Sequence, residues 1–222
     1  MEEQTIETKK PSLFGMILQP GEQFERLRER PVIWLPLILL SILGTVVAVL
    51  IALNVDYSTI PGPAMSAEEL ELTKMFGIIF GGLGGLFGTS IGLLVFGAIL
   101  FGIAKIVKSP VSFKQMFSLM IFTSFITTIG QLLNQLIIYA IGGDPYIMLT
   151  SINSFVGADG VLGAVLGVFE VFQIWYYVLL ALGLVKVAQL SKPAAYTIAI
   201  IFFILGLIVA AIGGVFEGIA QF

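Results

Sequence analysis

The chain has 222 residues, of which 58% are hydrophobic and only 11% are charged, and its formal net charge is −3. Soluble domains carry about a quarter charged residues, so this composition excludes an ordinary soluble protein and predicts an all-α, polytopic integral membrane protein. The absence of cysteine and histidine excludes disulfide bonds and thiolate chemistry, and it removes most zinc ligands and the commonest general base. No basic tract indicates a nucleic-acid partner, and we expect no cofactor.

Residues 1–31 predict a cytoplasmic segment that contains an amphipathic helix at the membrane interface. The first ten residues include three glutamates and no apolar run, so we expect no cleaved signal peptide. Pro20-Gly21 can begin a short helix that carries Phe24 and Leu27 on one face, and Pro31 ends it. We expect this helix to lie in the plane of the interface with its arginines toward lipid headgroups, either as a simple anchor or as a docking site.

Five apolar stretches are long enough to cross a bilayer, whose hydrocarbon core of about 30 Å requires about 20 residues of helix. They occupy residues 32–53, 76–104, 117–141, 161–187 and 194–212 and define a membrane domain over residues 32–222. The second and fourth stretches exceed 25 residues, so we expect those helices to tilt or to protrude from the hydrocarbon.

The basic residues predict the orientation of these spans. Ten of the eleven lysines and arginines fall in the N-terminal segment or in the loops after spans two and four. The alternate loops and the C-terminal tail carry Lys74 together with the acids Asp56, Glu68, Glu69, Glu71, Asp144, Asp159 and Glu217. Basic residues favour the cytoplasmic side. The sequence therefore predicts a cytoplasmic N-terminus and an external C-terminus.

Two capping boxes mark helix starts. Ser66 precedes Glu69 by three residues, and Ser112 precedes Gln115 by three, which is the spacing at which both side chains bond backbone amides reciprocally. Span two is therefore expected to begin outside the bilayer near Ala67, and the helix of span three to begin after Ser112.

Span two is rich in glycine. Small residues spaced four apart let two helix backbones approach closely. This face packs either within the bundle or against another membrane protein, including a second copy of the chain. The glycines of the candidate face are Gly81, Gly84, Gly85, Gly88 and Gly92.

Amides and one acid form a polar set within spans three and four, and their spacing places them on two helix faces directed into the bundle. The set consists of Gln131, Asn134, Gln135, Glu170 and Gln173. A carboxyl group within a membrane is costly and by default marks a function. For Glu170 three interpretations stay open: a structural hydrogen bond, with the Gln131/Asn134 face as one partner; a proton or cation site; and a partner contact.

A cytoplasmic docking surface is a third candidate site. It combines the N-terminal helix with the loop after span two: Phe24, Arg26, Arg28, Arg30, Lys105, Lys108 and Lys114. Catalysis is not expected. The string Gly88-Thr-Ser-Ile-Gly92 matches a hydrolase nucleophile elbow only in its letters, because an elbow requires a strand–turn–helix and the chain has no histidine to activate Ser90.

Three blocks of sequence resemble the Yip family, whose name derives from proteins that interact with Ypt/Rab GTPases. They are "QPGEQFERLRERPVIWLPLIL" before span one, "KSPVSFKQMFSLMIFTSFI" at the start of span three, and "FEVFQIWYYVLLALGLVKVAQLSKPAAYTIAII" across spans four and five. The resemblance covers nearly the whole chain and implies five spans with the N-terminus inside. It implies the bacterial form of the family, which lacks Rab partners, and it supplies no catalytic residues.

The narrower likeness to a bacterial member implies a partnership with the subunits of an ABC exporter and protection against a secreted peptide toxin. The leading hypothesis is therefore a non-enzymatic adaptor in the bacterial plasma membrane, in contact with lipids and other membrane proteins. The alternative is a conduit for a small solute or ion that uses the polar set around Glu170.

Overall fold

The computed structural model describes residues 9–59 and 63–220, and most of the described residues are helical. Within those ranges the β-structure amounts to one isolated bridge between Ser151 and Glu170. The all-α prediction is therefore confirmed.

The helices differ greatly in length. In chain order they are α1 (Gly15–Leu18), α2 (Pro20–Glu29), α3 (Trp34–Asn54), the short 3₁₀ helix η1 (Tyr57–Thr59), α4 (Ala67–Leu83), the π-helical segment η2 (Gly84–Gly88), α5 (Thr89–Ile106), α6 (Phe113–Ile141), α7 (Asn153–Val156), α8 (Gly160–Val168), α9 (Val171–Lys186) and α10 (Lys192–Ala220).

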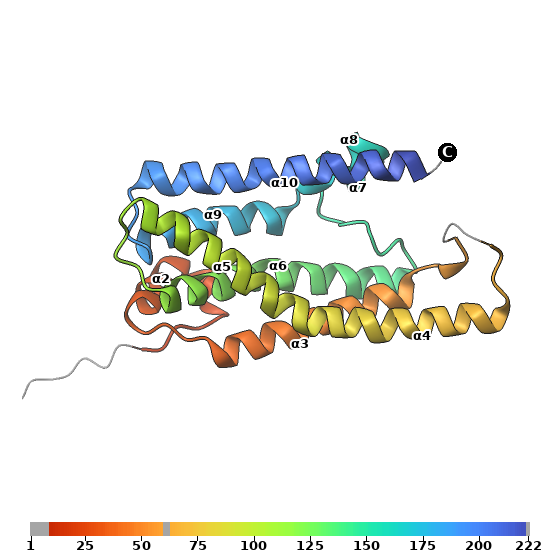
Figure 1. The fold of residues 1–222 in the computed structure, drawn as a ribbon, viewed down its shortest axis with the longest axis horizontal. Coiled ribbons are helices and arrows are strands. Elements are labelled where there is room, and N and C mark those ends of the chain that lie inside the picture. Colours follow the sequence, from red (N-terminus) through yellow and green to blue (C-terminus); the bar gives the residue numbers. More distant parts are fainter. Residues whose placement is uncertain (1–8, 60–62, 221–222) are drawn as a thin grey trace, which may run out of the picture.

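The long helices run along the long axis of an elongated bundle, so that its connections collect at two ends (Figure 1). One end carries the N-terminal segment, the loop from α5 to α6 and the loop from α9 to α10. These parts hold ten of the eleven basic residues, so this end is called the basic end. The opposite end carries the loop from α3 to α4 and the last turns of α6 and α10, and is called the acidic end. The two ends reproduce the predicted alternation of loops.

Four helical stretches are long and apolar enough to span a membrane by length and composition. They are Trp34–Asn54, Ala67–Ile106, Phe113–Ile141 and Lys192–Phe216. The second is 40 residues long because α4, η2 and α5 continue one another. Its start at Ala67, and that of α6 at Phe113, carry the predicted capping boxes, in which Glu69 N and Gln115 N each donate to the cap serine. Several long apolar helices in one chain are typical of a polytopic membrane protein.

The fourth predicted span, residues 161–187, is not one continuous helix. The stretch divides into α8 and α9, separated by Phe169, whose φ of −78° and ψ of 71° are not helical, and by Glu170 in an extended conformation. Phe169 O accepts a hydrogen bond from Ile152 N at 3.0 Å. The fourth traverse of the bundle is therefore a discontinuous helix, whose main part, α9, has 16 residues.

The hydrophobic core lies toward the basic end and is centred on α6. Two thirds of the most apolar window of α6 is buried, against a third or less for the other three spanning stretches. Phe122 and Phe125 of α6 pack there with residues of α9 and with α2. The remaining long helices present large apolar side chains outward, as expected for helices in contact with lipid.

Helix α2 packs against the bundle rather than resting on lipid. Phe24 and Leu27 are fully buried, and α2 contacts both α9 and α6. A Cβ atom at Gly183 of α9 would lie 3.1 Å from the Phe24 ring and closer still to Leu119 of α6. The predicted amphipathic helix exists, and its apolar face covers the basic end of the protein itself.

Candidate functional site

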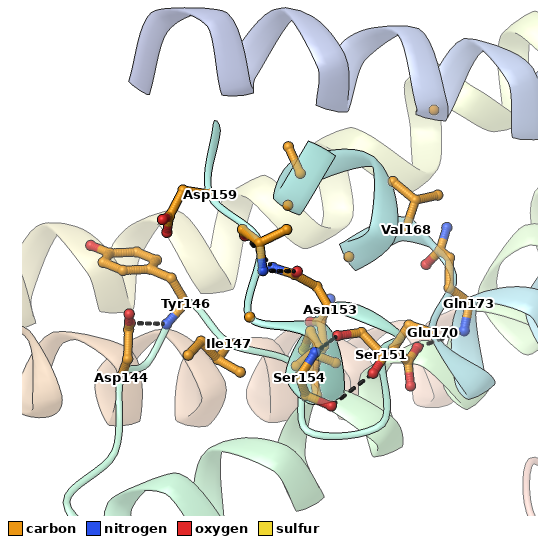
Figure 2. A pocket seen from close by; sticks show the side chains of 18 of the residues that line it. Asp144, Tyr146, Ile147, Ser151, Asn153, Ser154, Asp159, Val168, Glu170 and Gln173 are labelled. Atoms are coloured by element: carbon orange, nitrogen blue, oxygen red, sulfur yellow. Dashed lines mark hydrogen bonds between the residues drawn. The ribbon is translucent and has the colours of Figure 1, made fainter. Parts of the chain in front are cut away.

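A cavity of about 640 Å³ opens between α6, the segment 142–159, α8 and the start of α9. Gly206 of α10 completes its wall. Figure 2 shows Asp144, Tyr146 and Asp159 on one side of this cavity and Glu170 and Gln173 on the other. The polar residues that line it are Thr127, Gln131, Asp144, Tyr146, Ser151, Asn153, Ser154, Asp159, Glu170, Gln173 and Tyr177.

The segment 142–159 forms the cavity because it folds back along α6 instead of connecting α6 to α8 directly. It leaves α6 at Gly142, whose positive φ of 67° is a conformation that glycine adopts without strain. Asn134 then binds it with both ends of its amide, donating to Ile147 O at 2.9 Å and accepting from Leu149 N at 2.8 Å. Gln135 Nε2 donates to Pro145 O at 2.9 Å. Two buried amides thus hold an irregular backbone against a helix within the bundle.

Asn134 and Gln135 bond to the segment 142–159 rather than to a neighbouring helix. Both side chains are buried, as predicted, but their partners are backbone groups of the segment 142–159. An irregular segment at this depth has backbone groups without helical partners, and in a membrane those groups must be satisfied by protein. Asn134 and Gln135 provide hydrogen-bond partners for backbone groups of this segment.

Glu170 is 4% exposed and acts as the N-cap of α9. Its carboxylate accepts hydrogen bonds from Phe172 N at 3.0 Å, from Gln173 N at 2.7 Å and from the Thr150 hydroxyl. The first two satisfy amides that a helix start leaves open, and the third ties the segment 142–159 to the break in the fourth traverse. The carboxylate thus has a structural hydrogen-bonding role, but Gln131 and Asn134 are not its partners.

Gln131 and Gln173 both line the cavity. The structure therefore brings three of the five predicted polar residues, Gln131, Glu170 and Gln173, to one site, with Asn134 and Gln135 holding its wall. The cavity residues Asp144 and Asp159, and Thr150, which donates a hydrogen bond to Glu170, were not predicted. The dipeptide Asp144-Pro145 is typical of a turn, but nothing in the sequence indicates that this loop returns to the depth of Glu170.

The cavity carries negative charge without a compensating cation. Asp144, Asp159 and Glu170 contribute carboxylates, and no lysine or arginine is among the lining residues. Asp159 occupies the N-cap position of α8, yet its side chain forms no capping bond, and Asp144 accepts one bond, from Tyr146 N at 2.8 Å. Among the described residues no group of three or more acids is arranged to hold a metal ion.

Toward the basic end the cavity ends on the packed core. Thr127 of α6 and Tyr177 of α9 line the cavity. The residues of these helices that pack into the core toward the basic end, Ile126 and Phe125 on α6 and Leu179 and Leu180 on α9, are at most 2% exposed. The cavity is thus a pocket in the acidic half of the bundle.

The five glycines of the predicted face divide into two groups. Gly81 and Gly85 lie against α3, where a Cβ atom at Gly85 would stand 2.5 Å from Gly44 O. A Cβ atom at Gly84, Gly88 or Gly92 would meet nothing within 4 Å. The first group packs inside the bundle, and the second faces outward.

At the basic end, the docking residues proposed from the sequence are in different environments. Phe24 is buried and packs inside the protein, so it does not belong to an exposed docking surface. Arg28, Arg30, Lys105, Lys108 and Lys114 are exposed and Arg26 is partly exposed.

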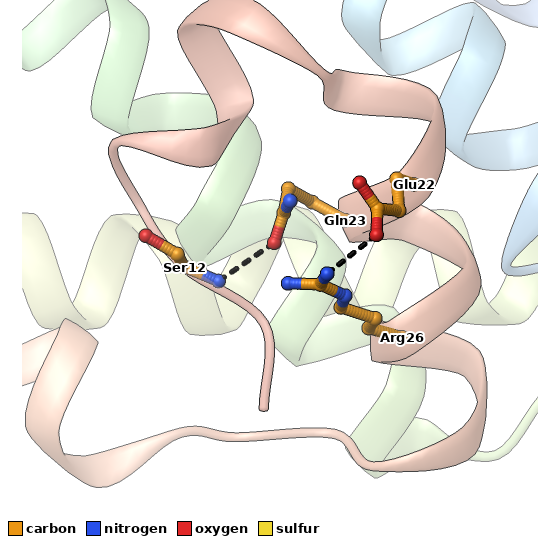
Figure 3. A network of polar contacts seen from close by, with 4 residues as sticks. All are labelled: Ser12, Glu22, Gln23 and Arg26. Atoms are coloured by element: carbon orange, nitrogen blue, oxygen red, sulfur yellow. Dashed lines mark hydrogen bonds and ion pairs between the residues drawn. The ribbon is translucent and has the colours of Figure 1, made fainter. Parts of the chain in front are cut away.

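Contacts around α2 fix this helix in place. Gln23 Oε1 accepts from Ser12 N at 2.8 Å, and Arg26 pairs with Glu22 on the same helix (Figure 3). Glu25 forms an ion pair with Lys186 of α9. The hydrogen bond and charge of Lys186 lower the pKa of the Glu25 carboxyl from its ordinary value.

The family model described as the Yip1 domain matches residues 14–213. The chain is also 36% identical over 222 residues to "Membrane protein YknW" of Bacillus subtilis (strain 168), an alignment that covers 96% of this chain and 94% of that protein. No solved structure matches the chain.

Proposed function

Because the chain belongs to the Yip1 domain family of membrane proteins, we propose that it is a non-enzymatic adaptor that assembles with other membrane proteins. Its membrane is the bacterial plasma membrane, and its basic end faces the cytoplasm. The orientation is supported by the placement of ten of eleven basic residues at that end, since cytoplasmic loops carry the excess of lysine and arginine.

The observation that carries this proposal is the outward-facing group Gly84, Gly88 and Gly92. A glycine in a helix interior costs about 1 kcal/mol relative to alanine, and none of these three is needed for packing within the chain, because a Cβ atom at each would meet open space. Large apolar side chains, Phe87 and Ile91 among them, are exposed beside them. A second transmembrane helix could approach this strip closely enough for backbone contact.

The partner that the family resemblance implies is an ABC exporter, with protection against a secreted peptide toxin as the outcome. In this proposal the adaptor binds an exporter subunit through the strip of Gly84, Gly88 and Gly92, with the exposed basic residues Arg28, Lys108 and Lys114 available to the cytoplasmic parts of the same partner. The conduit alternative has less support, because the cavity ends on core residues such as Phe125 and Leu180 that are at most 1% exposed.

The test replaces Gly84 and Gly88 together by leucine and measures co-purification of exporter subunits from crosslinked native membranes. The leucines enter open space, so the fold should be retained while the close approach is blocked. Gly102→Leu is the matched control, because a Cβ atom at this α5 glycine also meets nothing within 4 Å. Loss of the subunits with Gly84→Leu/Gly88→Leu and their retention with Gly102→Leu would support the adaptor. Equal recovery from both variants would remove this face from the proposal.

A further inference from the structure

The cavity beside Glu170 has properties that the adaptor function does not use. Its volume of about 640 Å³ lies in the range of small-molecule sites, roughly 300–1,000 Å³. It is walled by a segment that Asn134 and Gln135 hold in place, so the space belongs to the bonded structure of the protein.

Gly167 provides a separate indication that this space is maintained. It is the second-last residue of α8, and its φ is not positive, so the backbone conformation does not require glycine there. It lines the cavity, and a Cβ atom at this position would meet nothing within 4 Å. Gly167 is therefore not needed for contact between helices. Its missing side chain instead enlarges the cavity.

The charges of the lining residues select the ligand. Three carboxylates and no basic side chain line the cavity, and uncompensated charges of one sign in a cleft with low-dielectric walls focus the potential there. An anion, including the phosphate of a lipid, is disfavoured. Asp159 has no hydrogen-bond partner for its carboxylate, although it stands at a helix N-cap, so its charge is available to a ligand.

The spacing of the same carboxylates distinguishes between kinds of cation. Asp144 and Asp159 stand on one side of the cavity and Glu170 on the other (Figure 2), and among the described residues no three acids converge on a point that a metal ion could occupy. Separate charges are matched by a ligand with several positive groups along a flexible chain. Ile147, Met148 and Val168 line the same cavity and offer apolar contact to methylene groups.

We propose that this cavity is a binding site for a small linear polyamine, with one ammonium group near Asp144 and Asp159 and another directed toward Glu170, Gln173 and Gln131. The two glutamine side chains offer carbonyl oxygens as acceptors at the deep end. The aliphatic part of the ligand lies along α8 in the space left by Gly167. The site binds its ligand without a chemical step.

The experiment measures saturable binding of radiolabelled spermidine to the full chain in nanodiscs of zwitterionic lipid, which do not themselves attract the amine. The wild-type protein should bind spermidine more tightly than butylamine, which has a single charge. Asp159→Asn should weaken binding by about three- to five-fold, the size of one partly solvated charge pair, and Asp144→Asn/Asp159→Asn should weaken it further. Gly167→Leu should abolish binding by filling the cavity.

Two matched controls isolate the site. Glu68→Gln removes an exposed acid of α4 that does not line the cavity, and Gly102→Leu adds the same bulk on α5; both variants should bind spermidine as the wild type does. The proposal is overturned if the wild type shows no saturable binding, if Asp159→Asn and Gly167→Leu bind normally, or if Mg²⁺ displaces spermidine as effectively as unlabelled spermidine does. If circular dichroism shows that Gly167→Leu is not folded, Asp159→Asn decides the matter, because its exposed side chain forms no capping bond.

Discussion

The crossing of α3 with the glycine-rich helix gives the sharpest test of the packing, because two adjacent glycines there have opposite surroundings. A Cβ atom at Gly85 would lie 2.5 Å from Gly44 O and 2.7 Å from Thr45 Cα, whereas one at Gly84 would meet nothing within 4 Å. Ordinary contact begins near 3.4 Å, so the Gly85→Ala variant must push the backbone of α3 away by about 0.9 Å. A backbone carbonyl cannot rotate out of the way as a side chain can.

The two alanine variants share their intrinsic effect on the helix, and only one of them creates a clash. Replacing glycine by alanine favours a helix by about 1 kcal/mol, so Gly84→Ala should be neutral or more stable than the wild type. Overpacking costs about 1–3 kcal/mol, so the free energy of unfolding of Gly85→Ala should fall below that of Gly84→Ala by that amount. Titration with sodium dodecyl sulfate in mixed micelles, followed by circular dichroism, measures both. Equal stabilities would refute the close contact between α3 and η2.

Two further predictions concern the fourth traverse and the basic end. Glu170→Ala removes the cap of Phe172 N and Gln173 N and the bond from Thr150, so it should cost about 1–2 kcal/mol of stability and accelerate hydrogen exchange in the segment 142–159. Glu170→Gln keeps one acceptor oxygen and should have a smaller effect. Unchanged exchange in both variants would contradict the capping role. The ion pair with Lys186 lowers the pKa of Glu25 below its ordinary value of 4.5, so its contribution is present at neutral pH and is lost as the pH falls below 4.5 through the folded-state pKa. Proteolysis of α2 should therefore increase in that acidic range in the wild type, and Lys186→Met should remove this step; an identical acid profile in the variant would show that the pair does not hold α2.

Local signals in the sequence predicted the helix starts correctly. Ser66 with Glu69, and Ser112 with Gln115, form capping boxes because the cap residue and its partner lie within one turn of each other. Nothing distant can change that geometry. The burial of Asn134 and Gln135 was predicted for a similar reason, since amides are not left in lipid without partners.

The break in the fourth traverse was not predictable from hydropathy, because residues 161–187 are apolar on both sides of Glu170. The break depends on the segment 142–159, whose Thr150 and Ile152 supply bonds to Glu170 and Phe169. Such partners lie about 20 residues away in the chain, so neither periodicity nor composition indicates them. Glutamate is also an uncommon N-cap residue, so the one local signal was weak.

The division of the glycine face was also beyond the sequence. Spacing of four residues suggested that Gly81, Gly84, Gly85, Gly88 and Gly92 act together. The π-helical turn over Gly84–Gly88 places an additional residue in the turn and so shifts the phase of the helix. Gly85 consequently remains against α3 while Gly88 and Gly92 face outward. A regular 3.6-residue period cannot predict such a shift.

The most direct test of the account is the side of the membrane on which four loop residues lie. The chain has no cysteine, so single cysteines at Glu69, Lys108, Asp159 and Lys192 can each be labelled in intact cells with an impermeant maleimide. The account predicts labelling at Glu69 and Asp159, and protection at Lys108 and Lys192 until the cells are opened. Labelling of Asp159 and Lys192 from the same side would mean that α8 and α9 together do not cross the membrane, and would contradict the five-traverse fold on which the cavity and both proposed binding faces depend.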